Sequence, residues 1–510
     1  MISMRKLGLI VGTFLILALV VVACSPETET IVETRMVEVE KEVTRVVEGE
    51  VVTETVIEEV AVEVTREVIV EPEPEPEAPK PVTLNYNLGT EPPQLDPALT
   101  TDTTSVTLTQ NLFCPIVNID PVTSEVIPML ATDWEEGTDA DGNQTWTFNL
   151  RDDIAWVHHD PITGGPYVLE SWIHGGSLDM VKNPLWIDAD SVQIERIESV
   201  MITEASTAFA LYENNELDTV GVPLPEIDRV KADPVLSEEF YNAPAACTYY
   251  YGFTNTKYPM TDQRVRLAFS AAIDRQSLID NVTKGGQVPA TTFAPPGIFG
   301  NVEPGTMGQG YDPEAAVASL QAFLDEEGMT IDDFNALDIV LMHNTSEGHA
   351  RIAAAIQQMW KDVLGADVRV ENQEWAVYLD TLRNTTPVEE EAHVWRLGWC
   401  ADYADQNNWV HEVFNADAGA NRLRRNCLDP NCAETTTSEF DDLTVAAALS
   451  SDPAERAALY AQAEDILARV EAAYAPIYHY TTVQVTKPWL QRNYPNISGL
   501  DFFNWTVDMD

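Results

Sequence analysis

The stretch Arg396-Leu-Gly-Trp-Cys-Ala-Asp-Tyr403 places an arginine, two aromatic residues, a cysteine and an aspartate within eight residues. Such a cluster supplies both of the charges needed to hold a zwitterion, together with flat apolar surface. A second stretch, Cys247-Thr-Tyr-Tyr-Tyr-Gly-Phe253, supplies a cysteine that is a candidate disulfide partner for the first. The two stretches together indicate a ligand-binding site.

The N-terminal residues have the pattern of an export signal. Two basic residues precede an apolar run, Leu7 to Val22, which is shorter than the roughly 20 residues that a membrane-spanning helix needs. Ala23 before Cys24 fits a bacterial lipoprotein cleavage site, so we expect residues 1–23 to be removed and Cys24 to carry lipid. The alternative is an uncleaved membrane anchor. Polar sequence follows at once, which favours the lipoprotein and places residues 25–510 outside the cytoplasm.

The composition argues against two classes of function. The formal net charge of -54 disfavours nucleic-acid binding, which needs a basic face. That charge is more typical of a solvated surface than of an acidic active site. Phosphate-binding loops and the common hydrolase motifs are absent from the sequence. The chain is therefore predicted not to be an enzyme and to need no cofactor, with a hydrolase that lacks a motif as the alternative.

Two groups of residues are candidate metal ligands, and neither is expected to bind metal. Cys427 and Cys432 are separated by four residues, which is not the CxxC spacing of zinc sites, so a small local disulfide is the preferred interpretation. His158-His159-Asp160 contains two adjacent histidines, which would point in opposite directions in a strand, so an exposed turn before Pro161 is expected.

Residues 24–81 have too little variety to build a core. Valines and glutamates alternate, and one subset is spaced alternately by four and three residues, as in a coiled-coil seam: Val32, Met36, Val39, Val43 and Val46. Gly49 interrupts this pattern, and residues 60–64 are more typical of a strand. A self-associating stalk and a disordered spacer are both consistent with the composition. Residues 71–81 alternate proline with other residues and predict an extended polyproline spacer.

From Val82 onward, strands and helices interleave. Residues 82–88 alternate like a strand, and residues 338–343, 346–364 and 366–371 predict a strand, a helix closed by Gly365 and a parallel strand. Two Asp-Pro pairs, at residues 312–313 and 452–453, predict helix starts, and the second helix is expected to run to about Tyr474. About 430 residues exceed what one core usually organises, so at least two lobes are expected.

Several further stretches carry a family resemblance. They are Thr90–Pro97, Trp146–Arg151, Gly165–Trp172, Thr261–Arg275 and Glu371–Trp375. With the quoted cluster, they resemble the oligopeptide-binding proteins of ABC importers, in the peptide/nickel group of family 5 extracellular solute-binding proteins. The resemblance implies a two-lobed α/β fold, like that of periplasmic binding proteins, with a hinge. Lobe I would comprise residues 82–246 with 488–510, and lobe II residues 247–487.

The resemblance also assigns ligand-binding roles. Asp402 matches the aspartate that pairs with the α-amino group of a bound peptide. Arg396 and His349 match cationic groups that meet the α-carboxylates of peptides of different lengths. The other matched residues line the ligand cleft, and they are Trp375, Trp399, Tyr403 and Glu91. For Asp402, the alternative is a structural ion pair with Arg396.

The resemblance implies a disulfide between Cys247 and Cys400. With the local pair Cys427–Cys432, it would leave Cys114 as a free thiol. The sequence also departs from the family near residues 158–165, where a helical subdomain of the first lobe is missing. That subdomain would have covered one side of the cleft, so the first lobe is predicted to be truncated and the ligand less fully enclosed.

These patterns predict a lipid-anchored, extracytoplasmic receptor that captures oligopeptides by their termini and backbone and delivers them to the transmembrane permease subunits of an ABC transporter. Its membrane contact would run through the lipid anchor only. Three alternatives remain at the level of sequence. They are a receptor for another solute, such as a nickel chelate or an oligosaccharide, a surface peptide sensor or adhesin, and a degenerate paralogue without function.

Overall fold

The computed structural model describes residues 28–47, 50–69, 81–120, 123–153, 164–383, 385–494 and 500–508. The chain divides into two units, residues 1–80 and 81–510, which are described separately here. Cys24 and the His158-His159-Asp160 turn lie outside the described residues. No helix within these described ranges combines the length and the apolar character needed to cross a bilayer.

The Val/Glu-rich segment forms an antiparallel hairpin of two strands, β1 (Thr28–Val47) and β2 (Glu50–Ile69). The prediction of a coiled-coil seam was wrong. Successive residues of a strand alternate between its faces, so Val32, Met36 and Val46 share one face while Val39 and Val43 share the other. Valine and threonine recur throughout, and their stiff branched side chains favour strand over helix.

One face of this hairpin is exposed and acidic. Glu38 lies opposite Glu59, and both are exposed, as are Glu40, Glu42 and Glu63. Like charges directly opposite each other disfavour strand pairing unless water screens them. Part of the large negative charge of the chain therefore lies on a solvated surface.

The first lobe of the second unit is built on a four-stranded sheet. Its strands, in spatial order, are β3 (Thr83–Asn87), β10 (Arg196–Val200), β9 (Ser177–Lys182) and β8 (Tyr167–Ile173). The β3–β10 pair is parallel and the other pairs are antiparallel. Helix α2 (Thr103–Leu112) packs Leu108 into the core beneath the sheet, where Phe502 and Trp505 from the C-terminal segment are also buried.

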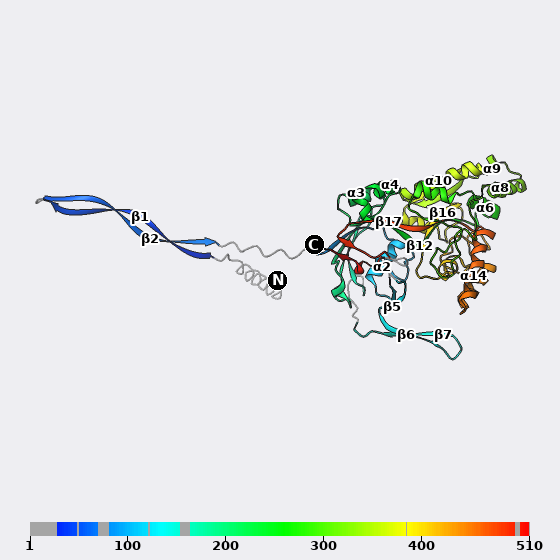
Figure 1. The fold of residues 1–510 in the computed structure, drawn as a ribbon, viewed down its shortest axis with the longest axis horizontal. Coiled ribbons are helices and arrows are strands. Elements are labelled where there is room, and N and C mark those ends of the chain that lie inside the picture. The colour runs from blue at the N-terminus through cyan, green and yellow to red at the C-terminus, as the bar shows by residue number, and fades with distance from the viewer. Residues whose placement is uncertain are drawn as a thin grey trace, which may run out of the picture. The chain divides into compact units, whose positions relative to one another are not determined.

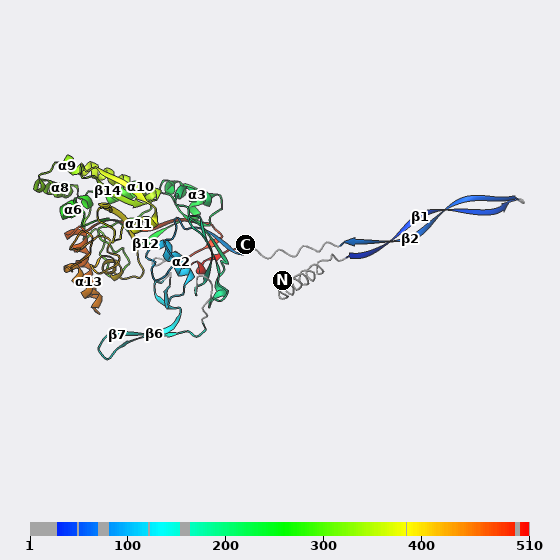
Figure 2. The ribbon, with the colours of Figure 1, turned by 180° about the vertical axis from the view of Figure 1, so that it is seen from behind.

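Two-stranded hairpins and short helices complete this lobe. They are β4 (Val117–Ile119) with β5 (Val126–Pro128), β6 (Ala131–Thr138) with β7 (Gln144–Leu150), β18 (Leu490–Gln491) with β19 (Thr506–Val507), and the helices α3 (Ala205–Glu213), α4 (Ile227–Ala232) and α5 (Leu236–Glu239). The β6–β7 hairpin extends beyond the edge of its unit (Figures 1 and 2).

The second lobe is built on a seven-stranded mixed sheet. Its strands, in order, are β11 (Thr219–Gly221), β17 (Tyr474–Thr486), β12 (Phe240–Phe253), β16 (Val394–Cys400), β14 (Ile339–Asn344) and β15 (Val368–Gln373), with β13 (Val288–Pro289) also paired to β17. β12 crosses the predicted lobe boundary at residues 246–247. The predicted lobe boundaries themselves stay predictions.

Helices cover both faces of this sheet. One apolar core lies under α6 (Gln263–Ala271), α8 (Pro313–Glu327) and α10 (Glu347–Leu364). The other core lies under α11 (Trp375–Thr381), α13 (Glu439–Leu449) and α14 (Pro453–Asp465). Successive residues of a strand point to opposite faces of the sheet. Tyr249 and Tyr251 therefore pack in one core, and Tyr250 packs in the other.

The predicted strand–helix–strand unit is confirmed. β14 and β15 pair in parallel, and α10 connects them. The Ser346 hydroxyl caps the helix N-terminus by accepting the His349 N–H. Gly365 ends the helix with φ at 71°, a left-handed conformation that glycine adopts without a steric penalty.

The two Asp-Pro helix starts are also confirmed, since Asp312 caps α8 and Asp452 caps α14. The second helix ends earlier than predicted. It continues through one π-helical turn to Val470, whereas Tyr474 already begins β17 and pairs with Gly252. Pairing with β12 therefore overrides the helical pattern near residue 474.

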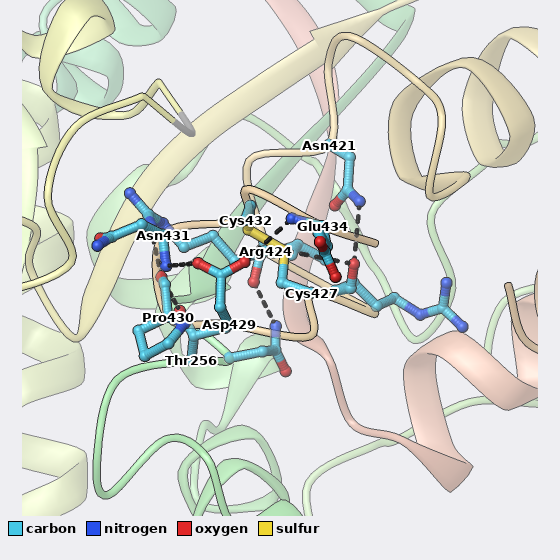
Figure 3. The surroundings of a disulfide bond; sticks show 12 residues. Thr256, Asn421, Arg424, Cys427, Asp429, Pro430, Asn431, Cys432 and Glu434 are labelled. Carbon is cyan, nitrogen blue, oxygen red and sulfur yellow. Dashed lines mark hydrogen bonds between the residues drawn. A yellow bond between two sulfur atoms is a disulfide. The ribbon is translucent and has the colours of Figure 1, made fainter. Parts of the chain in front are cut away.

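Both predicted disulfides are present, and Cys114 is a free thiol whose pKa burial raises to about 11. Figure 3 shows the Cys427–Cys432 loop. Its Pro430 carbonyl accepts hydrogen bonds from Thr256 and from Arg424, whose guanidinium also pairs with Glu391 in the fully buried interior. The metal-site alternative for these two cysteines is therefore wrong.

The Cys247–Cys400 bond joins β12 to β16 across a sequence separation of 153 residues. Removing a native disulfide typically costs about 2–5 kcal/mol, and the chain-entropy model puts so long a loop near the top of this range. We expect Cys247→Ser with Cys400→Ser to lower the free energy of unfolding by about that amount in urea titrations. Cys114→Ser is the matched control and should change it little. Equal stability of the double variant and the parent chain would contradict the prediction.

Candidate functional site

Strand β16 carries or adjoins most of the candidate ligand-binding residues. It lies between β12 and β14, where Arg396 is opposite Tyr251 and Gly398 is opposite Tyr249. Arg396 and Trp399 lie within the strand, and Asp402 follows its end. Residues 396 and 399 have opposite parity, so they face opposite sides of the sheet. The sequence cluster therefore divides into two separate groups.

The first group surrounds the Arg396 guanidinium, which lies 4.5 Å from the centre of the Tyr249 ring. Its Nη1 atom donates to Asn344 Oδ1 at 3.1 Å, and its Nη2 atom donates to the Tyr480 hydroxyl. The residue is only 8% exposed, and its buried Nε has no hydrogen-bond partner. Within the described residues, no carboxylate pairs with this cation.

Gly398 makes room for this arrangement. A Cβ atom at this position would lie 3.1 Å from the Tyr480 hydroxyl and 3.4 Å from Arg396 Nη2. Contacts this short would require the tyrosine or the guanidinium to move. The glycine of the quoted cluster therefore allows Arg396 to contact the Tyr249 ring while it donates to the Tyr480 hydroxyl.

Two histidines lie close to the guanidinium. His349, in the first turn of α10, is hydrogen-bonded through Nδ1 to the Tyr249 hydroxyl at 3.3 Å, and its ring centre is 6.4 Å from that of His343. Burial, reinforced by the charge of Arg396, holds the pKa of His349 well below its ordinary value. Burial likewise lowers the pKa of His343. His349 is therefore neutral at neutral pH, and its expected cationic role would require a nearby anion.

The second group surrounds Asp402. Asn408, in the π-helical turn Asn407–His411, donates from Nδ2 to Asp402 Oδ2 at 2.9 Å and to Glu412 Oε2 at 2.8 Å. Its Oδ1 atom accepts from the Asp402 N–H and from the Trp399 indole. The Tyr403 hydroxyl donates to Glu412. One amide thus holds two carboxylates and an indole in place.

Asp402 has no cationic partner within the described residues. Water reaches its side chain, yet the surrounding protein raises the carboxyl pKa above its ordinary value of 3.8, and the charge of Glu412 adds to that effect. Arg396 and Asp402 do not pair with each other, so the alternative of a structural ion pair between them is wrong. A charge that lacks a partner in a protein interior is costly, and this applies to the buried Arg396 but not to Asp402, which is exposed to water.

The remaining predicted residues lie apart from these two groups. The Trp375 indole, at the start of α11, donates at 3.3 Å to Asp102, the N-cap of α2 in the first lobe. Glu91 accepts from the Trp172 indole at 2.9 Å and from the Gly175 N–H. Glu91 therefore secures the turn between β8 and β9, and no contact joins it to Arg396 or Asp402 in the described part of the chain.

The structure adds residues that the sequence interpretation did not select. They are Tyr249, Asn344, Asn408, Glu412 and Tyr480. Tyr249 lies two residues after Cys247, so the expected disulfide could have placed it beside Gly398. Asn344, Asn408, Glu412 and Tyr480 carry no comparable signal.

Residues 155–421 match the family model of the bacterial extracellular solute-binding proteins, family 5. The chain belongs to this family. The family model describes solute-binding proteins.

Two relatives are similar over most of the second unit. The oligopeptide-binding protein OppA of Bacillus subtilis is 32% identical over 351 residues, which are 68% of this chain and 59% of that protein. The periplasmic oligopeptide-binding protein OppA of Salmonella typhimurium is 30% identical over 333 residues, or 64% and 57% of the two chains. The chain thus spans less than two thirds of the length of each relative.

Solved structures share the fold. The Escherichia coli murein tripeptide binding protein MppA aligns with a TM-score of 0.71 at 23% identity, over 84% of this chain and 99% of that one. This likeness confirms the two-lobed α/β fold expected from the sequence.

Proposed function

We propose that this chain is the extracytoplasmic receptor of an ABC importer and captures oligopeptides by their charged termini. Arg396 would meet the α-carboxylate, and Asp402 would meet the α-ammonium group. Trp375, Trp399, Tyr403 and His349 would complete the binding site. The relatives whose names describe oligopeptide binding support this class of ligand.

The observation that carries the proposal is the absence of an opposite charge around Arg396. Its guanidinium is buried, its Nε donor is unused, and its partners are all neutral. A carboxylate would satisfy that donor and form a charge-assisted hydrogen bond, the stronger kind. Asp402 offers the complementary feature, a carboxylate held by a neutral amide. Free termini are also the features common to peptides of any sequence, together with the backbone.

The same observation weakens the alternative solutes. An uncharged oligosaccharide would leave both the guanidinium and the carboxylate without a counter-charge. A nickel chelate with carboxylate arms would meet Arg396 but offers no ammonium group for Asp402. A peptide supplies both charges in one molecule.

A lipid anchor at Cys24 is the second part of the proposal. Ala23-Cys24 follows an apolar run of the length typical of an exported lipoprotein signal. The Val/Glu-rich hairpin and the proline-rich segment 71–81 would then lie between the anchored residue and the binding unit. Anchoring would keep the receptor at the membrane that holds its permease.

We expect calorimetry to show the terminal contacts when blocked peptides are combined with variants of the protein. Trialanine should bind, and either N-acetylation or C-amidation should weaken it. Losing one partner of a desolvated charge pair typically costs about 2–5 kcal/mol, which is the loss expected for C-amidation at the buried Arg396. N-acetylation should cost less, because water screens the exposed Asp402. Asp402→Asn should abolish the difference between free and acetylated peptide, and Arg396→Gln should abolish the difference between free and amidated peptide.

Each variant is the control for the other, because the effect of C-amidation should survive in Asp402→Asn and that of N-acetylation in Arg396→Gln. Asp405→Asn adds a matched aspartate control, since Asp405 is already paired with Arg456 at 2.8 Å. If acetylated trialanine binds the parent chain as tightly as trialanine does, the assignment of Asp402 is wrong.

Affinity should also depend on pH through Asp402. Its pKa is raised in the free protein, and a bound ammonium group would lower it. The contribution of this contact is then complete above the free-state pKa and is lost as the pH falls through it, starting above the ordinary carboxyl value of 3.8. Calorimetry across this range should show the loss for trialanine but not for acetyl-trialanine. Identical profiles for the two peptides would contradict the contact.

The lipid anchor predicts a defined N-terminus. Mass spectrometry of protein extracted from membranes should find residues 1–23 absent and a lipid mass on Cys24. Cys24→Ala should release the chain from the membrane fraction. A mature protein that still begins at Met1 would refute the anchor.

A further inference from the structure

The β6–β7 hairpin exposes aromatic side chains without any contact that explains them. Its register places Trp134 opposite Phe148 and Glu136 opposite Trp146, so the three aromatic residues share one face. Trp146 is 51% exposed and Leu150, two positions beyond Phe148, is 66% exposed. We call the face formed by Trp134, Trp146, Phe148 and Leu150 the aromatic face.

The hairpin is structurally isolated. β6 and β7 form a sheet of two strands, so each strand keeps one unpaired edge. The side chains of residues 132–149 form their hydrogen bonds within the hairpin itself, as in the Asn149–Asp133 and Gln144–Glu136 contacts. A hairpin of two strands is at best marginally stable alone in water, and exposed aromatic patches mark interaction sites. Within the described residues, these features leave the aromatic face without a covering element.

The charge around the aromatic face restricts what that chain can be. Residues 131–153 contain seven acidic residues and a single basic one, Arg151, which is already paired with Asp153 at 2.9 Å. Asp133 and Glu135 lie on the face opposite the aromatic one, and we call this the acidic face. Asp139 and Asp141 add charge at the turn.

We propose that the β6–β7 hairpin is a docking site for an extended, cationic segment of another protein. The segment adds a strand to a free edge of the hairpin, where backbone N–H and C=O groups are not paired with another strand. Its alternate residues then divide between the two faces. Apolar side chains pack on the aromatic face, and lysines or arginines lie over Asp133 and Glu135. A partner that alternates apolar and basic residues fits this surface.

The same charges disfavour the other occupants. A second copy of this chain would bring two strongly acidic hairpins together, and like-charge contacts across an interface are costly. An anionic membrane surface would be repelled for the same reason. A purely apolar segment would leave Asp133 and Glu135 without counter-charges.

Two blocked octapeptides test the proposal with the full chain. One alternates valine and lysine, and the other places four valines before four lysines, so composition and charge are identical. Both are acetylated and amidated, which prevents binding through free peptide termini. Calorimetry at moderate salt should show at least about tenfold tighter binding of the alternating peptide, which corresponds to about 1.4 kcal/mol. Higher salt should weaken that binding.

Trp146→Ser with Phe148→Ser should abolish the preference for the alternating peptide. Thr147→Ser is the matched control, because Thr147 lies between them in sequence but on the acidic face, and the preference should remain. Equal binding of the two peptides, or an unchanged preference in the double variant, would overturn the proposal. It would also be overturned if sedimentation showed the chain alone forming a dimer that the double variant cannot form, because the occupant would then be a second copy.

Discussion

Burial of the Arg396 guanidinium is the constraint on which the proposed binding site depends. The cation lies against the Tyr249 ring and donates to a neutral amide and a neutral hydroxyl, so the fold solvates it without neutralising it. Its charge also contributes to keeping His349 unprotonated. The lobe thus holds a desolvated positive charge with an unused donor, and beyond the end of β16 it holds Asp402 through Asn408. Electrostatic preorganisation of this kind lets a ligand form strong contacts without first displacing an internal partner.

The pairing of β12 with β16 explains why so much of this arrangement could be predicted from sequence. Once Cys247 and Cys400 are expected to be bonded, the antiparallel register follows, and it places Tyr249 beside Gly398. The local signals were equally direct, because Ser346 and Gly365 mark the two ends of α10. Residues such as Tyr480 and Asn408 were not predicted. The first reaches Arg396 from a strand 84 positions away, and the second depends on a π-helical turn that has no sequence signature.

The Val/Glu-rich hairpin and the β6–β7 hairpin show where local sequence patterns give a wrong prediction or none. A four-three spacing of apolar residues in a segment rich in valine and threonine fits a helix seam by position, but the branched side chains favour strands, and the segment forms the β1–β2 hairpin. The stretch Trp146–Arg151 carries a family resemblance, which does not predict how its side chains are arranged. The register shows that Trp146 and Phe148 share a face with Trp134, and both side chains are exposed.

The central claim is that the two unpaired charges are completed by the two ends of a peptide. Native mass spectrometry of the protein purified without added ligand, followed by release and sequencing of whatever remains bound, tests this most directly. The account predicts a mixture of short peptides with free amino and carboxyl termini, present on the parent chain and depleted from the Asp402→Asn variant. A single non-peptide solute, retained equally by both proteins, would contradict it.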